Sequence, residues 1–175
     1  MTLSGVRRPL RVAVVGAAGA SEDEYALARA LGSALASEGA LVLCGGYGGV
    51  MEAAARGAAE AGGLTVGILK GHDAEAANPW IAIPLATGLG EARNALVVGT
   101  AEAVLAVGGA WGTLSEIALA RKGGRAVGTL GRPPAQGLGL PAFSSPEEAA
   151  SWAVVEARRR RGEKPGPGSG TSRRR

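Results

Sequence analysis

Residues 11–44 hold two short apolar runs with a helical stretch between them, and they read RVAVVGAAGASEDEYALARALGSALASEGALVLC. The runs at 12–15 and 40–44 are apolar throughout, which is typical of parallel strands covered by helices on both faces. Between them, Ser21 and Glu24 have the spacing of a capping box, and the apolar residues that follow recur on one helical face. Gly39 then supplies a helix stop. The stretch predicts a strand–helix–strand unit.

The same alternation continues along the chain on both sides of this unit. Strands are expected at Arg11–Val15, Ala40–Cys44, Leu64–Leu69, Ile81–Leu85, Ala103–Val107 and Ala126–Leu130. Helices are expected from Ser21, from about Gly49 to Ala61, from near Glu91, from near Thr113, and from Ser145, where Pro146 suits the first helical position. This order predicts an α/β fold in a single domain, with a Rossmann-like, doubly wound and mostly parallel sheet.

Composition excludes several kinds of site. The chain has 175 residues, of which 46% are apolar and only 3% aromatic, so we expect a core of small side chains. Cys44 is the one cysteine and His72 the one histidine, which excludes an internal disulfide and a Cys/His metal site. No apolar run approaches the roughly 18 residues that span a membrane. We therefore expect a cytoplasmic protein with no metal site and no membrane partner.

The net charge of +4 is unevenly distributed. From Arg158 onward the sequence has eight basic residues and one acidic residue, so the tail carries +7 and residues 1–157 carry −3. We therefore divide the chain into a domain at 1–157 and a basic tail at 158–175, whose Gly, Pro and Ser content predicts disorder. The tail is interpreted either as a solubilising end or as a segment that weakly attracts nucleic acid.

Three glycine-rich segments follow predicted strands, at Gly16–Gly19, Gly45–Gly49 and Gly108–Thr113. In a doubly wound sheet, ligands bind at the carboxyl ends of the strands, where helix N-termini offer free N–H groups to phosphate. Ala18 replaces the second glycine of a dinucleotide-binding fingerprint, and no segment has the Gly-Lys-Ser/Thr of a P-loop. The predicted ligand is a small phosphorylated molecule of the nucleotide class.

The run Gly108–Glu116, GGAWGTLSE, resembles the Pro-Gly-Gly-x-Gly-Thr-x-x-Glu signature of LONELY GUY (LOG) proteins, which are often mislabelled lysine decarboxylases. The run Gly45–Glu52, GGYGGVME, is similar to the family's first glycine loop. The run Glu91–Asn94, EARN, falls where the family has an arginine at a helix start. The resemblance covers about residues 10 to 155. It is closest to a bacterial branch that is also similar to molybdenum-cofactor carrier proteins.

The resemblance implies a homo-oligomer, a dimer or larger, that needs no cofactor. It implies hydrolysis of the N-glycosidic bond of nucleoside 5′-monophosphates to free base and ribose 5-phosphate. The implied catalytic pair is Glu116, which stabilises the sugar cation and activates water, and Arg93, which fixes the anionic substrate. The expected ligand-binding residues are Gly16, Gly45, Gly46, Gly48, Gly49, Asn94, Gly108, Gly109, Trp111, Gly112 and Thr113.

Departures from the family pattern keep other functions open. Gly108 stands in place of the proline, Ala110 in place of a glycine, and Asn94 in place of a lysine. These changes favour a non-catalytic carrier that binds the molybdenum cofactor or another phosphorylated, nucleotide-like ligand. A third hypothesis is a ligand sensor whose basic tail contacts nucleic acid. Thr113 and Glu116 also have capping-box spacing, which gives Glu116 a purely structural interpretation.

Overall fold

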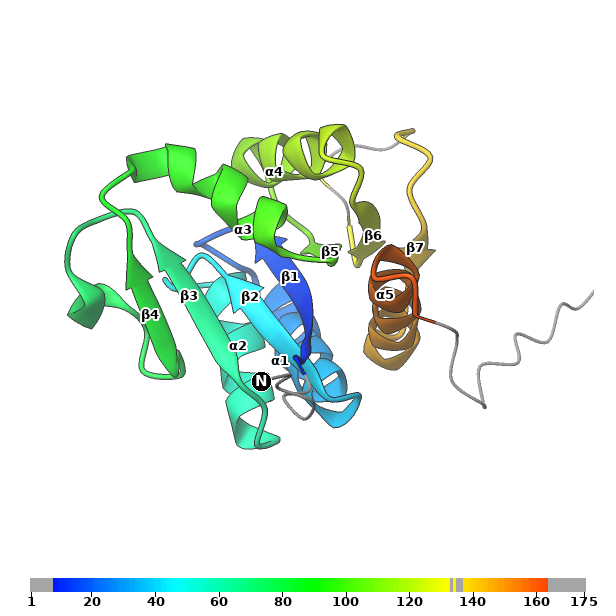
Figure 1. Ribbon diagram of the computed structural model, residues 1–175, viewed down its shortest axis with the longest axis horizontal. Coiled ribbons are helices and arrows are strands. Elements are labelled where there is room, and N and C mark those ends of the chain that lie inside the picture. The colour runs from blue at the N-terminus through cyan, green and yellow to red at the C-terminus, as the bar shows by residue number, and fades with distance from the viewer. Residues whose placement is uncertain (1–7, 133, 135–136, 164–175) are drawn as a thin grey trace, which may run out of the picture.

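The computed structural model describes residues 8–132, 134 and 137–163, which form one seven-stranded sheet between two layers of helices (Figure 1). The strands lie in the order β4-β3-β2-β1-β5-β6-β7, and every neighbouring pair is parallel. Their bounds are Leu10–Gly16 (β1), Ala40–Cys44 (β2), Thr65–Leu69 (β3), Ile83–Ala86 (β4), Ala103–Val107 (β5), Ala126–Leu130 (β6) and Ala142–Phe143 (β7). The predicted Rossmann-like fold is confirmed.

Helices cover both faces of the sheet, as the burial of consecutive residues in β1 requires. Val12 and Val14 share a buried cluster with residues of α1, α2 and α5, whereas Ala13 and Val15 share one with residues of α3 and α4. These two groups of helices lie on opposite faces of the sheet (Figure 1). The helices are α1 (Glu22–Ser37), α2 (Val50–Glu60), α3 (Asn94–Thr100), α4 (Trp111–Lys122) and α5 (Pro146–Arg160), with 3₁₀ turns η1 (Ala74–Ala76) and η2 (Gly90–Arg93). Both layers consist mainly of Ala, Val and Leu, as the composition predicted.

The capping chemistry that defines α1 and α5 agrees with the sequence. Ser21 accepts a hydrogen bond from the Glu24 N–H, and the Glu24 carboxylate accepts one from the Ser21 N–H at 2.9 Å. Ser145 caps α5 by accepting a hydrogen bond from the Glu148 N–H, with Pro146 as the first helical residue. These caps satisfy N–H groups that a helix start leaves without intrahelical partners.

Three predicted elements differ in detail from the structure. The strand β4 is not covered on both faces, because it lies at the edge of the sheet, where Ile83 and Leu85 are exposed. The helix expected near Glu91 begins as the 3₁₀ turn η2 and becomes α-helical only at Asn94. The helix expected near Thr113 begins at Trp111. The two-residue strand β7 was too short to predict.

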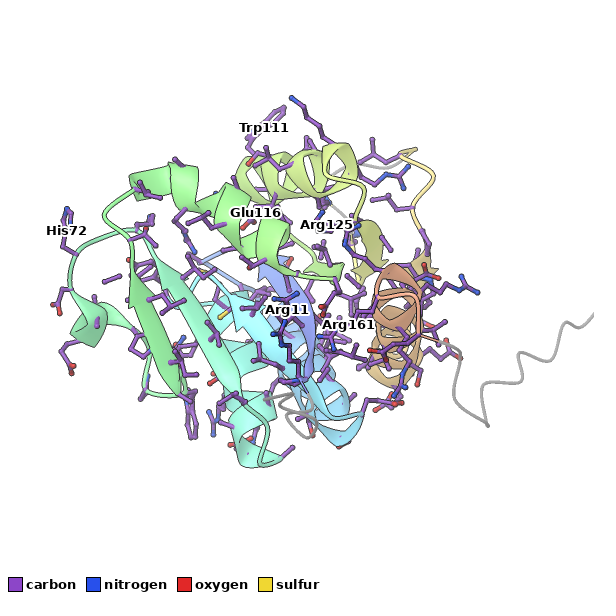
Figure 2. All side chains as sticks on the ribbon, in the orientation of Figure 1. Arg11, His72, Trp111, Glu116, Arg125 and Arg161 are labelled. Carbon is purple, nitrogen blue, oxygen red and sulfur yellow. The ribbon has the colours of Figure 1, made fainter. Side chains whose placement is uncertain are left out.

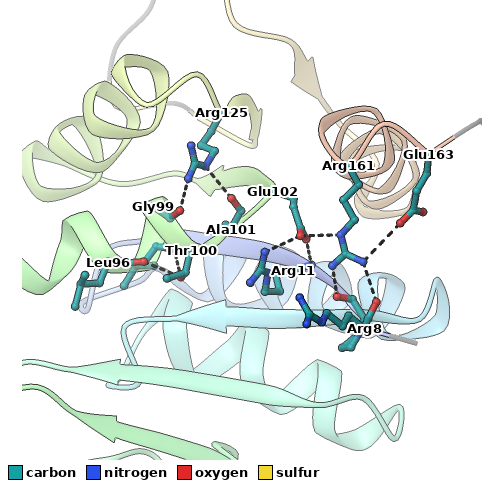
Figure 3. Close-up of polar contacts among 12 residues, drawn as sticks. Arg8, Arg11, Leu96, Gly99, Thr100, Ala101, Glu102, Arg125, Arg161 and Glu163 are labelled. Carbon is teal, nitrogen blue, oxygen red and sulfur yellow. Dashed lines mark hydrogen bonds and ion pairs between the residues drawn. The ribbon is translucent and has the colours of Figure 1, made fainter. Parts of the chain in front are cut away.

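The last helix crosses residue 157, the boundary that the sequence analysis proposes between the domain and the basic tail. The helix α5 continues to Arg160, and Arg161 donates a 2.8 Å hydrogen bond to Glu102 at the start of β5 (Figure 3). Arg161 also donates to the carbonyl oxygens of Arg8 and Pro9. Arg11 pairs with Glu102 from the other side, at 2.8 Å. These contacts, which we call the terminal clasp, fasten the end of α5 to β1 and β5; residues 164–175 lie outside the described residues.

The order of the strands fixes where a ligand can bind. From β1 the chain runs outward to β2, β3 and β4 on one side, and then returns to place β5 on the other side of β1. This reversal opens a crevice at the carboxyl ends of β1 and β5, which is the usual ligand position in open α/β sheets.

Candidate functional site

A pocket of about 480 Å³ occupies that crevice. Its floor is the end of β1 and the turns after β1 and β2, and its walls come from the end of β3, from η2 and from the start of α4. Its lining residues are Val14, Val15, Gly16, Ala17, Ala18, Gly45, Tyr47, Met51, Lys70, Glu91, Arg93, Asn94, Ala110, Gly112, Thr113 and Glu116. The structure therefore brings Arg93 and Glu116, from segments 23 positions apart in the sequence, into one pocket.

Arg93 is a buried cation with unused hydrogen-bonding capacity. Only 5% of the residue is exposed, and its Nη1 donates a 2.8 Å hydrogen bond to the Ile68 carbonyl oxygen. Its Nε is buried without a hydrogen-bond partner. The guanidinium also lies 5.6 Å from the centre of the Tyr47 ring, a cation–π distance. A buried N–H without a partner is costly, so Arg93 is poised to donate to a ligand.

Asn94, the residue after Arg93, has a hydrogen-bond acceptor without a partner. Its Oδ1 is buried without a partner, while its Nδ2 lies 3.5 Å from a carboxylate oxygen of Glu91. The unpartnered donor and the unpartnered acceptor therefore belong to neighbouring residues that both line the pocket. This pattern is typical of a site that a polar ligand completes.

Glu116 lies in the second turn of α4 and lines the pocket. It is on the side of the helix that faces the sheet (Figure 2). Only 8% of the residue is exposed. Burial raises the pKa of its carboxyl group to about 7; the charge of Arg93 opposes this change and that of Glu91 adds to it. A carboxyl group with this pKa exchanges a proton near neutral pH, which suits acid–base chemistry or a hydrogen bond to a ligand.

The structure contradicts the capping-box interpretation of Glu116. The helix starts two residues before Thr113, with Ala110 as an N-cap that makes no side-chain hydrogen bond. Thr113 is instead a buried residue of the first turn that lines the pocket. The first intrahelical bond runs from the Leu114 N–H to the Ala110 carbonyl oxygen, so the earlier N–H groups stay available to an anion.

Of the other predicted ligand-binding residues, Gly16, Gly45 and Gly112 line the pocket, whereas Trp111 does not. Trp111 is 85% exposed and projects outward from the start of α4, away from Glu116 (Figure 2). Five further glycines are also absent from the lining: Gly46, Gly48, Gly49, Gly108 and Gly109.

Close packing explains why most of these five positions are occupied by glycine. Gly49 has a φ of +65°, and a Cβ there would collide with the carbonyl oxygens of Ala17 and Ala18. That close approach lets the Val50 N–H donate a 3.0 Å hydrogen bond to Ala17, which joins the start of α2 to the turn after β1. A Cβ on Gly108 would similarly meet the Glu24 side chain. These glycines shape the pocket by allowing its walls to pack closely.

Lys70 and Glu91 form a charged side of the pocket near the end of β3, which the sequence analysis does not identify. The Lys70 Nζ and a Glu91 carboxylate oxygen are 2.8 Å apart at the mouth of the pocket. Tyr47 lies behind them, and its hydroxyl accepts a 2.9 Å hydrogen bond from the Lys70 N–H. Lys70 follows the last residue of a predicted strand, and this position was the one available signal in the sequence.

Within residues 8–132, 134 and 137–163, no three His, Cys, Asp or Glu side chains are grouped so that they could bind a metal ion. Cys44 is fully buried beneath the pocket, and burial raises the pKa of its thiol to about 11. In the same part of the chain, each helix is too short or too polar to cross a membrane.

Comparisons with known proteins agree with this architecture. The chain matches the SLOG cluster4 family over residues 9–156. The molybdenum cofactor binding protein from the phototrophic bacterium Rippkaea orientalis has a similar structure, with a TM-score of 0.81 and 35% identity over 86% of this chain and 98% of that one. The molybdenum cofactor carrier protein of Chlamydomonas reinhardtii gives a TM-score of 0.77 and 32% identity over 85% and 98%.

A protein of Archaeoglobus fulgidus is 40% identical over 145 residues, which are 83% of this chain and 95% of that protein. The resemblance to LOG-like proteins, in the branch that includes molybdenum-cofactor carriers, is confirmed at this level. The chain belongs to the SLOG cluster4 family.

Proposed function

We propose that the chain binds a phosphorylated pterin cofactor of the molybdenum-cofactor class and carries it without converting it. The cofactor would lie in the pocket at the carboxyl ends of the strands, which we call the strand-end pocket. The observation on which the proposal rests is the pair of unpartnered polar atoms, Arg93 Nε and Asn94 Oδ1, buried in a pocket of about 480 Å³. The two named molybdenum-cofactor proteins support it, because they are 32–35% identical to this chain over 98% of their own length.

The residues of the pocket fit such a ligand. The free N–H groups of the first turn of α4, which include those of Gly112 and Thr113, suit a phosphate. Arg93 adds a fixed positive charge, while Asn94 and Glu116 offer the mixed donors and acceptors that a pterin ring edge requires. The cofactor itself would supply the sulfur ligands of molybdenum. The protein's task would then be to hold the organic part and shield it from water.

Hydrolysis of nucleoside 5′-monophosphates is the second candidate, and the environment of Glu116 favours it. In that reaction water adds to C1′ of the ribose, the bond from C1′ to the base nitrogen breaks, and the base leaves with a proton. A carboxyl group with a pKa of about 7 is partly ionised at neutral pH and can accept the proton of the attacking water. The ionised form also stabilises positive charge on the sugar. This activity would increase as the pH rises through 7.

The test of the carrier proposal is retention of the intact cofactor. The chain is mixed under anaerobic conditions with molybdenum cofactor released from a denatured molybdoenzyme, and then separated by gel filtration. Molybdenum is quantified by mass spectrometry and pterin by fluorescence after oxidation. We expect close to one of each per chain, and a loss of about tenfold or more in affinity for Arg93→Met, which removes a charge-assisted hydrogen bond.

Arg121→Met is the matched control, because Arg121 is exposed at the far end of α4. Its retention should equal that of the unmodified chain. In parallel, AMP is incubated with the chain and analysed for adenine and ribose 5-phosphate. Cofactor retention without base release supports the carrier. Base release that disappears in Glu116→Gln, without retention, would replace the carrier with the hydrolase.

A further inference from the structure

The mouth of the pocket is closed on one side by an ion pair that is easily broken. Lys70, just after β3, and Glu91, in η2, are joined at 2.8 Å, and their side chains are 43% and 74% exposed. Exposed pairs of this kind contribute little to stability, because solvent screens the charges. Both residues also line the pocket, so a ligand that enters comes into contact with them.

The Glu91 carboxylate occupies a position that favours an anion. One oxygen contacts Lys70, and the other lies 3.5 Å from the Asn94 Nδ2. The pKa of the Glu91 carboxyl group is lowered by its hydrogen bond to Lys70 and by the charges of Lys70 and Arg93, while its slight burial acts in the opposite direction. Two cations and an amide donor therefore act on one carboxylate.

Both cations also have contacts other than Glu91: Arg93 donates to the Ile68 carbonyl oxygen, and both side chains lie near the Tyr47 ring. Tyr47 lies beside both, with its ring centre 5.5 Å from the Lys70 Nζ and 5.6 Å from the Arg93 guanidinium carbon. The Asn78 Nδ2 donates a 2.9 Å hydrogen bond to the Tyr47 carbonyl oxygen and holds that residue in place. If Glu91 rotates away, Lys70 and Arg93 remain where an incoming anion would meet them.

This site is distinct from the start of α4. The sheet order places β3 three strands away from β5, and three strand spacings amount to about 14 Å. The pocket therefore has one region that favours anions at each end.

We infer that Lys70, Arg93 and Asn94 form an anion subsite which the Glu91 carboxylate fills in the ligand-free chain and leaves when a ligand binds. This inference rests on the proposed function and adds to it a ligand-contacting residue, Lys70, and an internal competitor, Glu91. The subsite takes a group with several anionic oxygens. In a molybdenum cofactor, that group is either the phosphate monoester or the oxo-molybdenum group.

The test uses calorimetric titrations of the full chain with AMP, inorganic phosphate and molybdate. Glu91→Gln keeps the size of the side chain but removes the competing charge, so we expect about fivefold tighter binding of at least one anion. Lys70→Met should weaken binding of the same anion by about tenfold. Because Glu91 competes through Lys70, the double variant should not recover the gain of Glu91→Gln.

Glu75→Gln and Lys122→Met are the matched controls, since both side chains are exposed away from the pocket. Neither should change any affinity, and all five variants should melt within a few degrees of the unmodified chain without ligand. If Glu91→Gln and Lys70→Met change the affinity for AMP or phosphate, the subsite binds the phosphate group. If they change the affinity for molybdate alone, the subsite binds the oxo-molybdenum group. Unchanged affinity of Glu91→Gln for all three anions overturns the inference.

These outcomes are separable from those of the proposed function. If the chain fails to retain the cofactor while Glu91→Gln still tightens anion binding, the subsite stands and the carrier proposal falls. If the cofactor is retained and no anion responds to the two variants, the carrier proposal stands and the subsite falls.

Discussion

Arg93 lies directly over Gly45, so closely that a Cβ at position 45 would overlap the Arg93 Nη1. The buried guanidinium reaches the Ile68 carbonyl oxygen only because residue 45 has no side chain. Gly45 was predicted to admit a ligand to the backbone. In the structure it admits the side chain of an arginine, which then faces the pocket.

Gly45→Ala should therefore displace Arg93 while the backbone keeps its course. The new methyl group overlaps the guanidinium and the Met51 sulfur, and such overpacking costs about 1–3 kcal/mol of stability. We expect affinity for a phosphorylated ligand to fall by about tenfold, as if the arginine bond were removed. Calorimetry with AMP and thermal unfolding measure the two effects.

Gly99→Ala controls for the loss of a glycine, because a Cβ there meets no atom within 4 Å. Its binding should be unchanged and its stability within about 1 kcal/mol of the unmodified chain. Full affinity in Gly45→Ala would mean that the position of Arg93 is unimportant for binding.

The alternation of apolar runs and helix signals was sufficient to predict the sheet, its two helical layers and the position of the pocket. Hydrophobic periodicity and capping are local, and they do not depend on the rest of the fold. For this reason Ser21 and Ser145 are predictable as caps, and the segments after β1, β2 and β5, which contribute residues to the pocket, are predictable as ligand-facing.

Features that depend on contacts between distant segments were not predictable in this way. The exposure of β4 depends on the absence of a further strand beside it, and the roles of the glycines depend on which segment packs over each. Lys70 and Glu91 are 21 positions apart and meet only in the folded chain. Arg161 was assigned to the tail because its sequence neighbours are basic, although its partner, Glu102, lies 59 positions earlier.

Glu116 should make the protein less stable as the pH rises. Its pKa is about 7 in the folded chain against an ordinary value of 4.5, so the folded state binds more protons between these values. The stabilising contribution is complete below about pH 4.5 and is lost as the pH rises to 7, by up to about 3 kcal/mol. Urea unfolding from pH 5 to 8 measures this change.

Glu116→Gln cannot ionise, and it should remove this part of the pH dependence. The variant should gain stability relative to the unmodified chain at pH 8, but not at pH 5. If the free energy of unfolding changed with pH in the same way for both proteins, Glu116 would not be desolvated in the folded state.

The terminal clasp should stabilise the whole domain. Burial alone would raise the pKa of Glu102, but its hydrogen bonds to Arg161 and Arg11 outweigh that effect and lower the pKa below the ordinary value. Its contribution is therefore present above about pH 4.5 and is lost as the pH falls through the lowered value. Arg161→Met should cost about 1.5–3 kcal/mol at pH 7, as measured by urea unfolding.

Two truncations separate this clasp from the rest of the basic segment. Removal of residues 158–175 eliminates Arg161 and should lower stability at least as much as Arg161→Met does. Removal of residues 164–175 retains the clasp, and we expect unchanged stability and unchanged binding of AMP. A large loss of AMP affinity in the shorter truncation would assign the tail a part in ligand binding.

Cys44 should react with thiol reagents only when the domain opens. The thiol is fully buried and its pKa is raised to about 11, so the reactive thiolate is scarce at neutral pH. Labelling by iodoacetamide should therefore be slow, and a bound ligand should slow it further by stabilising the folded state. Rapid labelling of the folded chain would contradict the burial of Cys44.

The most direct test of ligand binding in the strand-end pocket is a ¹⁵N–¹H NMR titration with a stable pterin phosphate, neopterin monophosphate, and with AMP. We predict that the Arg93 Nε–H signal and the backbone signals of Gly112 and Thr113 shift together, at the same ligand concentration. If these signals stay fixed, or if only those of Arg8, Arg158 and Arg161 near the amino-terminal end of β1 move, the strand-end pocket is not the ligand site.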